Sequence, residues 1–125
     1  MQGDLVPLAN LRVLVVEDES IVAMMIEEFL IELGCIVVGS AARLGQALEL
    51  ARSVEVDMAV LDLNLAGEMS YPVAELLRAR GVPVIFATGY GSDGLSERFN
   101  DARVLPKPYN MLQLADALRA KCPRR

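Results

Sequence analysis

The 125 residues carry a net charge of −5 and contain no histidine, and 54% of them are hydrophobic. This length and apolar share fit one compact domain, while the acidic balance disfavours direct binding to nucleic acid or to an anionic membrane surface. The lack of histidine excludes Ser-His, Cys-His and His-ligated metal chemistry, and Cys35 and Cys122 fit no metal-ligand spacing, so we expect two reduced thiols.

The chain shows no targeting or membrane-spanning signal. Its first ten residues lack the basic start and sustained apolar run of a signal peptide, and no stretch approaches the ~18 apolar residues that cross a bilayer. We therefore expect a cytoplasmic protein.

Strand-like and helix-like segments alternate along the chain. Short β-branched or apolar runs predict strands over 12–16, 35–40, 58–63, 82–88 and 103–106. Apolar residues at helical spacing predict helices over 20–34, 43–53, 71–81 and 110–122. Ser20 and Asn110 are the predicted N-caps, and Pro72 and Gly81 mark the start and the stop of the third helix.

The segment 89–102 departs from this alternation. A helix is expected between the last two strands, yet Gly89, Gly91 and Gly94 crowd its first half. Each glycine costs ~1 kcal/mol relative to alanine inside a helix. We predict a loop over 89–94 and a short, weak fourth helix near 95–100.

The alternation predicts a three-layer α/β sandwich of flavodoxin-like type. Right-handed crossovers leave few topologies, and the order 2-1-3-4-5 is common for five parallel strands. We expect residues 1–125 to form a single domain with its core at about 10–121 and with no output domain.

Polar residues stand at the carboxyl ends of the predicted strands, where ligands bind in such sheets. Glu17 and Asp18 follow the first strand, Asp62 lies near the end of the third, Thr88 ends the fourth and Lys107 follows the fifth. Each residue alone has a structural explanation, such as a helix N-terminus or a turn. Together they predict one pocket with three carboxylates, a hydroxyl and an ammonium.

Such a pocket suits phosphoryl transfer. Three close carboxylates repel one another unless a proton or a cation relieves them, and Mg²⁺ prefers a few carboxylates plus waters. Mg²⁺, a lysine and a threonine hydroxyl could hold the oxygens of a phosphoryl group, with a carboxylate as its acceptor.

The motifs "VVEDE", "AVLDLNL", "FATGY" and "LPKPY" resemble those of a response-regulator receiver domain, over about residues 10 to 121. The resemblance implies a two-component phosphorelay, in which a histidine kinase or a phosphotransfer protein donates a phosphoryl group and a downstream protein responds. It also implies a phospho-acceptor that is not an enzyme beyond autophosphatase activity.

The resemblance implies roles for the acidic residues. Asp62 resembles the phospho-accepting aspartate, Asp18 the direct Mg²⁺ ligand and Glu17 the second acidic residue, which acts mainly through water. Asn64 would give its backbone carbonyl to the metal. Asn64 and Tyr90 also occupy positions that tune the phosphoryl lifetime in the family.

The resemblance also covers the other side of the pocket. Thr88 resembles the switch hydroxyl, and Lys107 the lysine that pairs with the phosphoryl group, with a cis bond to Pro108. The family usually has proline at position 66, where Ala66 stands in a loop and should matter little. It usually has an aromatic switch residue where this chain has Val104, which puts the usual switching in doubt.

The "FATGYG" stretch and the glycine-rich fourth helix resemble a subgroup of single-domain receivers found mainly in alphaproteobacteria. That subgroup is often paired with sensor kinases of the HWE or a related type.

Three other functions compete with this interpretation. A haloacid-dehalogenase-like hydrolase would need a second aspartate at the position of Asn64. A flavin module would need a phosphate-binding loop where Glu17 and Asp18 stand. A pseudo-receiver that only binds proteins is favoured by Val104 and opposed by the intact acidic set.

Overall fold

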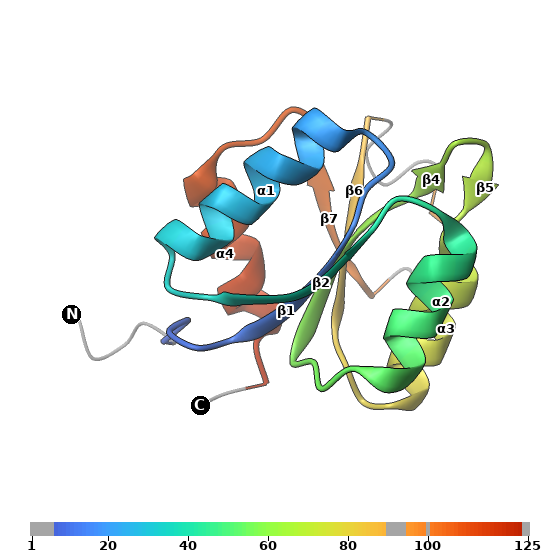
Figure 1. Ribbon diagram of the computed structural model, residues 1–125, viewed down its shortest axis with the longest axis horizontal. Helices are drawn as coiled ribbons and strands as arrows, with labels where there is room; N and C mark the ends of the chain where they lie inside the picture. Colours follow the sequence, from blue (N-terminus) through green and yellow to red (C-terminus); the bar gives the residue numbers. More distant parts are fainter. Residues whose placement is uncertain (1–6, 90–94, 100, 124–125) are drawn as a thin grey trace.

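The computed structural model describes residues 7–89, 95–99 and 101–123, and five parallel strands form their central layer (Figure 1). The strands run in the spatial order β2-β1-β3-β6-β7. Their bounds are β1 Arg12–Val16, β2 Ile36–Ala41, β3 Met58–Asp62, β6 Val84–Thr88 and β7 Arg103–Pro106. This is the predicted 2-1-3-4-5 order, so the predicted fold class is confirmed.

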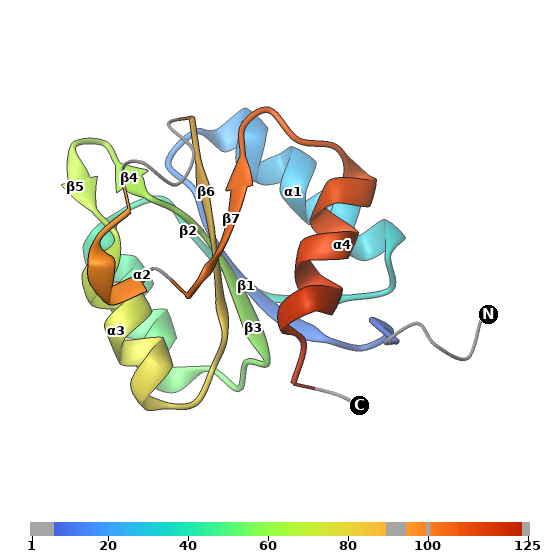
Figure 2. The ribbon, with the colours of Figure 1, turned by 180° about the vertical axis from the view of Figure 1, so that it is seen from behind.

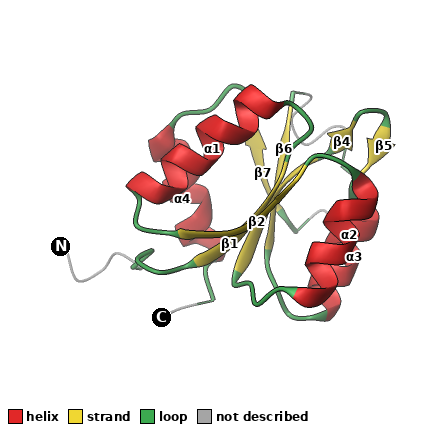
Figure 3. Ribbon diagram, in the orientation of Figure 1, coloured by secondary structure: helices red, strands yellow, loops and turns green. Residues whose placement is uncertain are grey.

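Two pairs of helices cover the two faces of the sheet (Figures 2 and 3). The pair α1 and α4 lies on one face, and the pair α2 and α3 lies on the other. Their bounds are α1 Ser20–Glu32, α2 Leu44–Ser53, α3 Tyr71–Ala79 and α4 Met111–Lys121. None of the helices in the described part of the chain has the length and apolar character needed to cross a membrane.

The helical layers create two separate hydrophobic cores. Successive side chains of a strand point to opposite faces, so Val13 and Val15 of β1 enter one core while Leu14 and Val16 enter the other. Both faces of the central strands are therefore buried. This explains why they read as continuous apolar runs rather than as alternating ones.

One of the two predicted helix caps is confirmed. The Asn110 side chain accepts a hydrogen bond from the Gln113 N–H at 2.8 Å, and the Gln113 side chain accepts one from the Asn110 N–H at 2.8 Å. The prediction for Ser20 is wrong, because Ser20 is already the first residue of α1. Glu19 takes the capping position without a side-chain bond, and its own N–H donates to the Glu17 carboxylate at 3.2 Å.

A small hairpin between β3 and α3 was not predicted. Its strands are β4 Asn64–Leu65 and β5 Glu68–Met69, and they pair in antiparallel fashion. Ala66 and Gly67 form the turn with φ angles of 52° and 96°. Two positive φ angles are what a tight two-residue hairpin turn demands.

The predicted break in the fourth helix agrees with the part of the segment that the structure describes. A single 3₁₀ turn, η3 (Glu97–Phe99), stands where a longer helix would otherwise lie. Of the predicted loop over 89–94, residues 90–94 lie outside the described residues, and so does residue 100.

The outer strand β2 contains a bulge. Val13 pairs with Val37 and Leu14 pairs with Gly39, so Val38 is an extra residue without a partner in the ladder between β1 and β2. Gly39 also lies close to its neighbours, because a Cβ there would approach Leu50 Cδ1 to 3.2 Å. The bulge and the glycine together let α2 pack tightly against this edge of the sheet.

Candidate functional site

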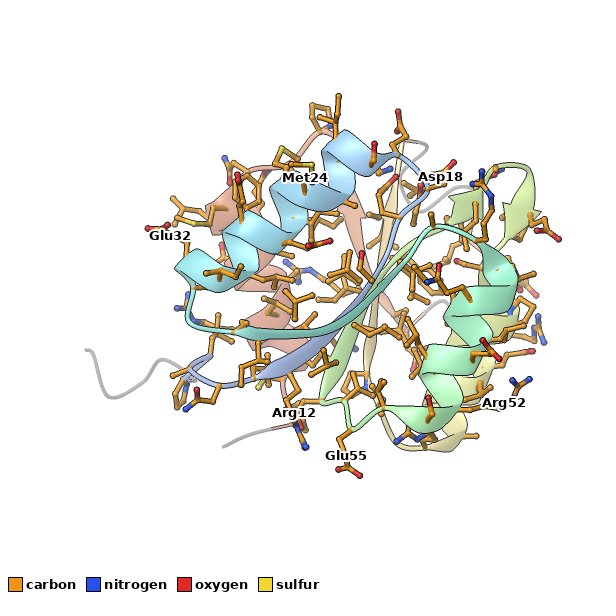
Figure 4. The ribbon with its side chains drawn as sticks, in the orientation of Figure 1. Arg12, Asp18, Met24, Glu32, Arg52 and Glu55 are labelled. Carbon is orange, nitrogen blue, oxygen red and sulfur yellow. The ribbon has the colours of Figure 1, made fainter. Side chains whose placement is uncertain are left out.

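Three acidic side chains meet at the carboxyl end of the sheet. Glu17 and Asp18 follow β1, and Asp62 ends the neighbouring strand β3. One carboxylate oxygen from each of the three lies within 4.8 Å of the others. Glu17 and Asp62 are only 2% and 8% exposed, so their charges are largely removed from water. Figure 4 shows Asp18 at the end of the molecule opposite to Arg12 and Glu55.

Lys107, which directly follows the edge strand β7, also contacts these carboxylates. Its Nζ donates to Glu17 Oε1 at 3.0 Å and lies 3.2 Å from Asp62 Oδ2. The Lys107–Pro108 peptide bond is cis, as predicted, and the Lys107 N–H donates to the Thr88 carbonyl at 3.0 Å. The loop after β7 is thereby tied to the end of β6, and the ammonium reaches the acidic pocket.

Burial and charge repulsion make Asp62 a weak acid. Burial, and next the negative charge of Glu17, raise the pKa of Asp62 to about 7, although Lys107 pulls it down. Burial also acts to raise the pKa of Asp18, but hydrogen bonds from Asp62 and from backbone N–H groups outweigh it and lower that pKa. Burial and the charge of Glu17 thus disfavour the ionised form of Asp62, and a bound proton or a cation would relieve the repulsion.

The pKa of Lys107 moves the other way. Burial acts to lower it, but the hydrogen bond to Glu17 and the charge of Asp62 outweigh burial and raise it. The side chain thus stays an ammonium and remains available to an anion. Among the described residues, Lys107 is the cation that contacts the three clustered carboxylates, through Glu17 and Asp62.

The donor set fits a small divalent cation. Closely spaced carboxylate oxygens are the ligands that Mg²⁺ prefers, and Glu17, Asp18 and Asp62 offer three of them. The raised pKa of Asp62 has burial and the charge of Glu17 as its main causes, and a bound cation would offset both. Asp18, Asp62 and Glu17 are the side chains that would hold the ion.

Asn64 and Thr88 border the pocket. The Asn64 N–H donates to Asp62 Oδ1 at 3.4 Å, and its side chain accepts from the Gly67 N–H at 2.7 Å, which closes the hairpin. Thr88 is 3% exposed at the end of β6, and its neighbour Ala87 pairs with Asp62. The roles predicted for both residues stay predictions. Tyr90, for which a role in phosphoryl lifetime was predicted, lies outside the described residues.

Ala66, which was expected to matter little, contacts the pocket. The Ala66 N–H donates to Asp18 Oδ2 at 3.1 Å, and the residue has a φ of 52°. Proline has no N–H and holds φ near −65°, so it could supply neither feature. Sequence reasoning missed this contact because it depends on the hairpin.

Tyr109 is a second residue that sequence reasoning left without a role. It follows the cis-proline and is 6% exposed, and its hydroxyl has no hydrogen-bond partner among the described residues. Burial, and then the negative charges of Glu17 and Asp62, raise its pKa. The signal available in the sequence was an aromatic residue directly after "LPKP".

The comparisons with known proteins agree with this geometry. A family model for the response regulator receiver domain matches residues 13–119. The transcriptional regulatory protein PdtaR of Mycobacterium tuberculosis is 32% identical over 111 residues, covering 86% of this chain and 54% of the relative. The chain thus spans about half the length of the first curated relatives that it matches.

Solved structures match over nearly the whole chain. The solution structure of SdrG from Sphingomonas melonis Fr1 has a TM-score of 0.80 and 45% identity, covering 89% of this chain and 95% of that one. The BeF3-activated conformation of SdrG from Pseudomonas melonis Fr1 has a TM-score of 0.76 and 43% identity, covering 90% and 96%. The chain belongs to the response regulator receiver domain family, with the sheet order and the acidic pocket of a receiver.

Proposed function

We propose that this protein accepts a phosphoryl group on Asp62 in a two-component phosphorelay. The observation that carries the proposal is the placement of the Asp62 carboxylate between Lys107 Nζ, at 3.2 Å, and the acidic pair Glu17 and Asp18. The match to a receiver structure described as BeF3-activated supports it.

The transfer step uses groups of this chain. An ionised Asp62 oxygen attacks the phosphorus of a phosphohistidine, the phosphorus–nitrogen bond breaks, and the imidazole leaves and takes up a proton. Lys107, already beside Asp62, stabilises the negative charge of the phosphoryl oxygens. Thr88 supplies a hydroxyl to the same oxygens. A Mg²⁺ ion held by Asp18, Asp62, Glu17 and the Asn64 carbonyl would neutralise the remaining charge.

A histidine kinase is the partner that membership of the receiver family implies, and we propose one of the HWE type. The first turns of α1, which begin directly after Glu19, offer a surface to it. Ile21 and Met24 are 81% and 61% exposed there, and Figure 4 shows Met24 pointing away from the sheet. Exposed apolar side chains on the helix that follows Glu17 and Asp18 suit a docking helix of the donor.

Several further expectations belong to this proposal. Residues 1–125 contain one receiver domain, which acts in the cytoplasm and passes its signal to a downstream protein rather than binding nucleic acid itself. It is a phospho-acceptor with at most autophosphatase activity. The competing proposal is a pseudo-receiver that only binds proteins, and its one specific support is Val104 in place of an aromatic switch residue.

Labelling of Asp62 tests the proposal. Wild-type protein incubated with Mg²⁺ and a small-molecule phosphodonor should gain one phosphoryl group by intact mass, and Asp62→Asn should gain none. Asp116→Asn, which removes an exposed carboxylate from α4, is the matched control and should be labelled like wild type. An unlabelled wild type, or stoichiometric labelling of Asp62→Asn, would favour the pseudo-receiver or another acceptor.

A further inference from the structure

The β4–β5 hairpin is anchored firmly beside the acidic pocket. Leu63 and Leu65, at its first strand, are only 3% and 1% exposed and belong to the core on the α2–α3 side of the sheet. The Ser70 N–H donates to the Leu63 carbonyl at 2.9 Å, which closes the base of the hairpin. Two buried side chains and a closed base therefore fix the direction in which the backbone of the turn points.

The turn of the hairpin is fixed as well. The Gly67 N–H donates across it to the Asn64 side-chain oxygen at 2.7 Å, and Ala66 and Gly67 have the positive φ angles of a two-residue turn. A backbone N–H in such a turn has one direction, and that of Ala66 points to Asp18 Oδ2 at 3.1 Å. Figure 4 shows Asp18 beside the hairpin that Figure 1 labels β4 and β5.

The hairpin contacts two of the three clustered carboxylates. The Asn64 N–H donates to Asp62 Oδ1 at 3.4 Å, and the Ala66 N–H donates to Asp18 Oδ2 at 3.1 Å. Asp62 ends β3, whereas Asp18 follows β1. One short hairpin thus sets the position of Asp18 relative to Asp62.

Asp18 is the least restrained of the three carboxylates. It lies in the loop between β1 and α1 and is less buried than Glu17 and Asp62. Lys107 forms ion pairs with Glu17 and Asp62, whereas Asp18 takes part in none of the ion pairs found among the described residues. The Ala66 N–H therefore ties the Asp18 carboxylate to a rigid part of the chain that is 48 residues away in the sequence.

The position of a carboxylate matters more for Mg²⁺ than for a larger cation. Mg²⁺ demands near-ideal octahedral geometry at about 2.0–2.1 Å, whereas Ca²⁺ accepts irregular sets of oxygen ligands at about 2.3–2.6 Å. Groups that hydrogen-bond to a metal ligand orient it, and their loss typically costs about 10–100-fold in metal affinity. A neutral N–H orients Asp18 without cancelling its negative charge, which a cationic side chain in the same place would partly do.

We infer that the Ala66 N–H is a positioning group for the metal site, which holds Asp18 so that the pocket binds Mg²⁺ in preference to Ca²⁺. The inference deepens the proposed function and rests on its Mg²⁺ site. The peptide group of Ala66 performs this role, rather than its side chain. The position therefore requires a residue that has an N–H and accepts a positive φ, and proline fails on both counts.

Calorimetric titrations of Mg²⁺ and of Ca²⁺ into Ala66→Pro test the inference. Because the variant lacks the N–H, its affinity for Mg²⁺ should fall about tenfold or more, and its affinity for Ca²⁺ should fall by much less. Gly67→Ala is the matched control, because it strains the same turn at a φ of 96° but keeps the Ala66 N–H. It should bind both ions like wild type. Equal losses in the two variants, or an Ala66→Pro variant with the wild-type preference for Mg²⁺, would overturn the inference.

A measurement on wild type decides the question even if Ala66→Pro does not fold. By linkage, a hydrogen bond that favours Mg²⁺ binding must be favoured by bound Mg²⁺ to the same degree. Hydrogen exchange of the Ala66 amide, followed by NMR, should therefore slow when Mg²⁺ replaces EDTA. The Gly34 amide, which donates to the Ile31 carbonyl at the far end of α1, is the control and should exchange at an unchanged rate.

The outcomes separate this inference from the proposed function. An Ala66 amide that exchanges equally fast or faster with Mg²⁺ would overturn the inference alone, and the phospho-acceptor role of Asp62 would stand. A wild type that binds no Mg²⁺ in the calorimeter would overturn the inference together with the metal site of the proposed function.

Discussion

Replacing Asp62 by asparagine should stabilise the metal-free protein, and more so as the pH rises. The pKa of Asp62 in the folded protein is raised from 3.8 to about 7, first by burial and next by the charge of Glu17. Between these pH values the folded state holds a proton that the unfolded chain has released. The stability associated with this group is complete below the unfolded pKa and is lost as the pH rises through about 7. Asparagine resembles the protonated acid and has no proton to lose.

The size of the effect follows from the same shift. Each pH unit over which the folded state holds one extra proton lowers the free energy of unfolding by about 1.4 kcal/mol. From pH 5 to pH 8 this applies for about two units, so the stability gap between Asp62→Asn and wild type should widen by about 2–3 kcal/mol. Because the pKa of Asp62 also depends on its interactions with Asp18 and Lys107, this figure is an upper bound.

Urea unfolding followed by circular dichroism, in EDTA at pH 5 and at pH 8, measures the gap. Asp116→Asn is the control for general pH effects, because its carboxylate is exposed on α4. Added Mg²⁺ should reduce the advantage of Asp62→Asn at pH 8, since the ion supplies the positive charge that the wild-type pocket lacks. A gap that stays constant or narrows from pH 5 to pH 8 would refute the electrostatic account of the pocket.

Three further changes test other contacts. Asp18→Asn should weaken Mg²⁺ binding by at least about tenfold in calorimetric titration, because it removes one of the clustered carboxylates; equal affinity would place the ion elsewhere. Ala66→Pro should lower the free energy of unfolding by about 3 kcal/mol, because proline has no N–H for Asp18 and cannot adopt a positive φ. Ala66→Gly should leave the free energy of unfolding unchanged or raise it by up to about 1 kcal/mol. A proline variant as stable as wild type would contradict the hairpin geometry. Asn110→Ala should cost about 1 kcal/mol in urea unfolding, and no loss would mean that the cap of α4 contributes nothing.

The sheet and its helices could be predicted because their patterns are long. β1 is apolar from Val13 to Val16 and β3 from Met58 to Leu61. α4 carries both an apolar periodicity and a cap at Asn110. The predicted order of parallel strands puts Glu17 and Asp18 next to Asp62, and the structure confirms that these three side chains lie together. Strand ends that are adjacent in the sheet bring distant residues together, and the sequence shows which residues stand at those ends.

The unpredicted features are short or depend on tertiary contacts. The strands of the β4–β5 hairpin have two residues each, too few for a period, and the turn relies on Ala66 in a conformation that alanine seldom adopts. Serine is a common N-cap, so the sequence favoured Ser20 as the cap of α1. In the structure Glu19 takes that position, and its N–H donates a hydrogen bond to the Glu17 carboxylate. The rings of Tyr71, Phe86 and Phe99 contact one another although these residues belong to α3, β6 and η3, and no local sequence pattern links them.

The two outer strands of the sheet bear on how this protein behaves at high concentration. A regular exposed edge invites pairing with a second chain, but the extra residue Val38 breaks the ladder of β2. At the other edge, β7 has only four residues and ends in Pro106, which cannot donate to a neighbouring strand. Neither edge is a good template for strand addition, so we expect self-association, where it occurs, to use helical faces rather than a continuous intermolecular sheet.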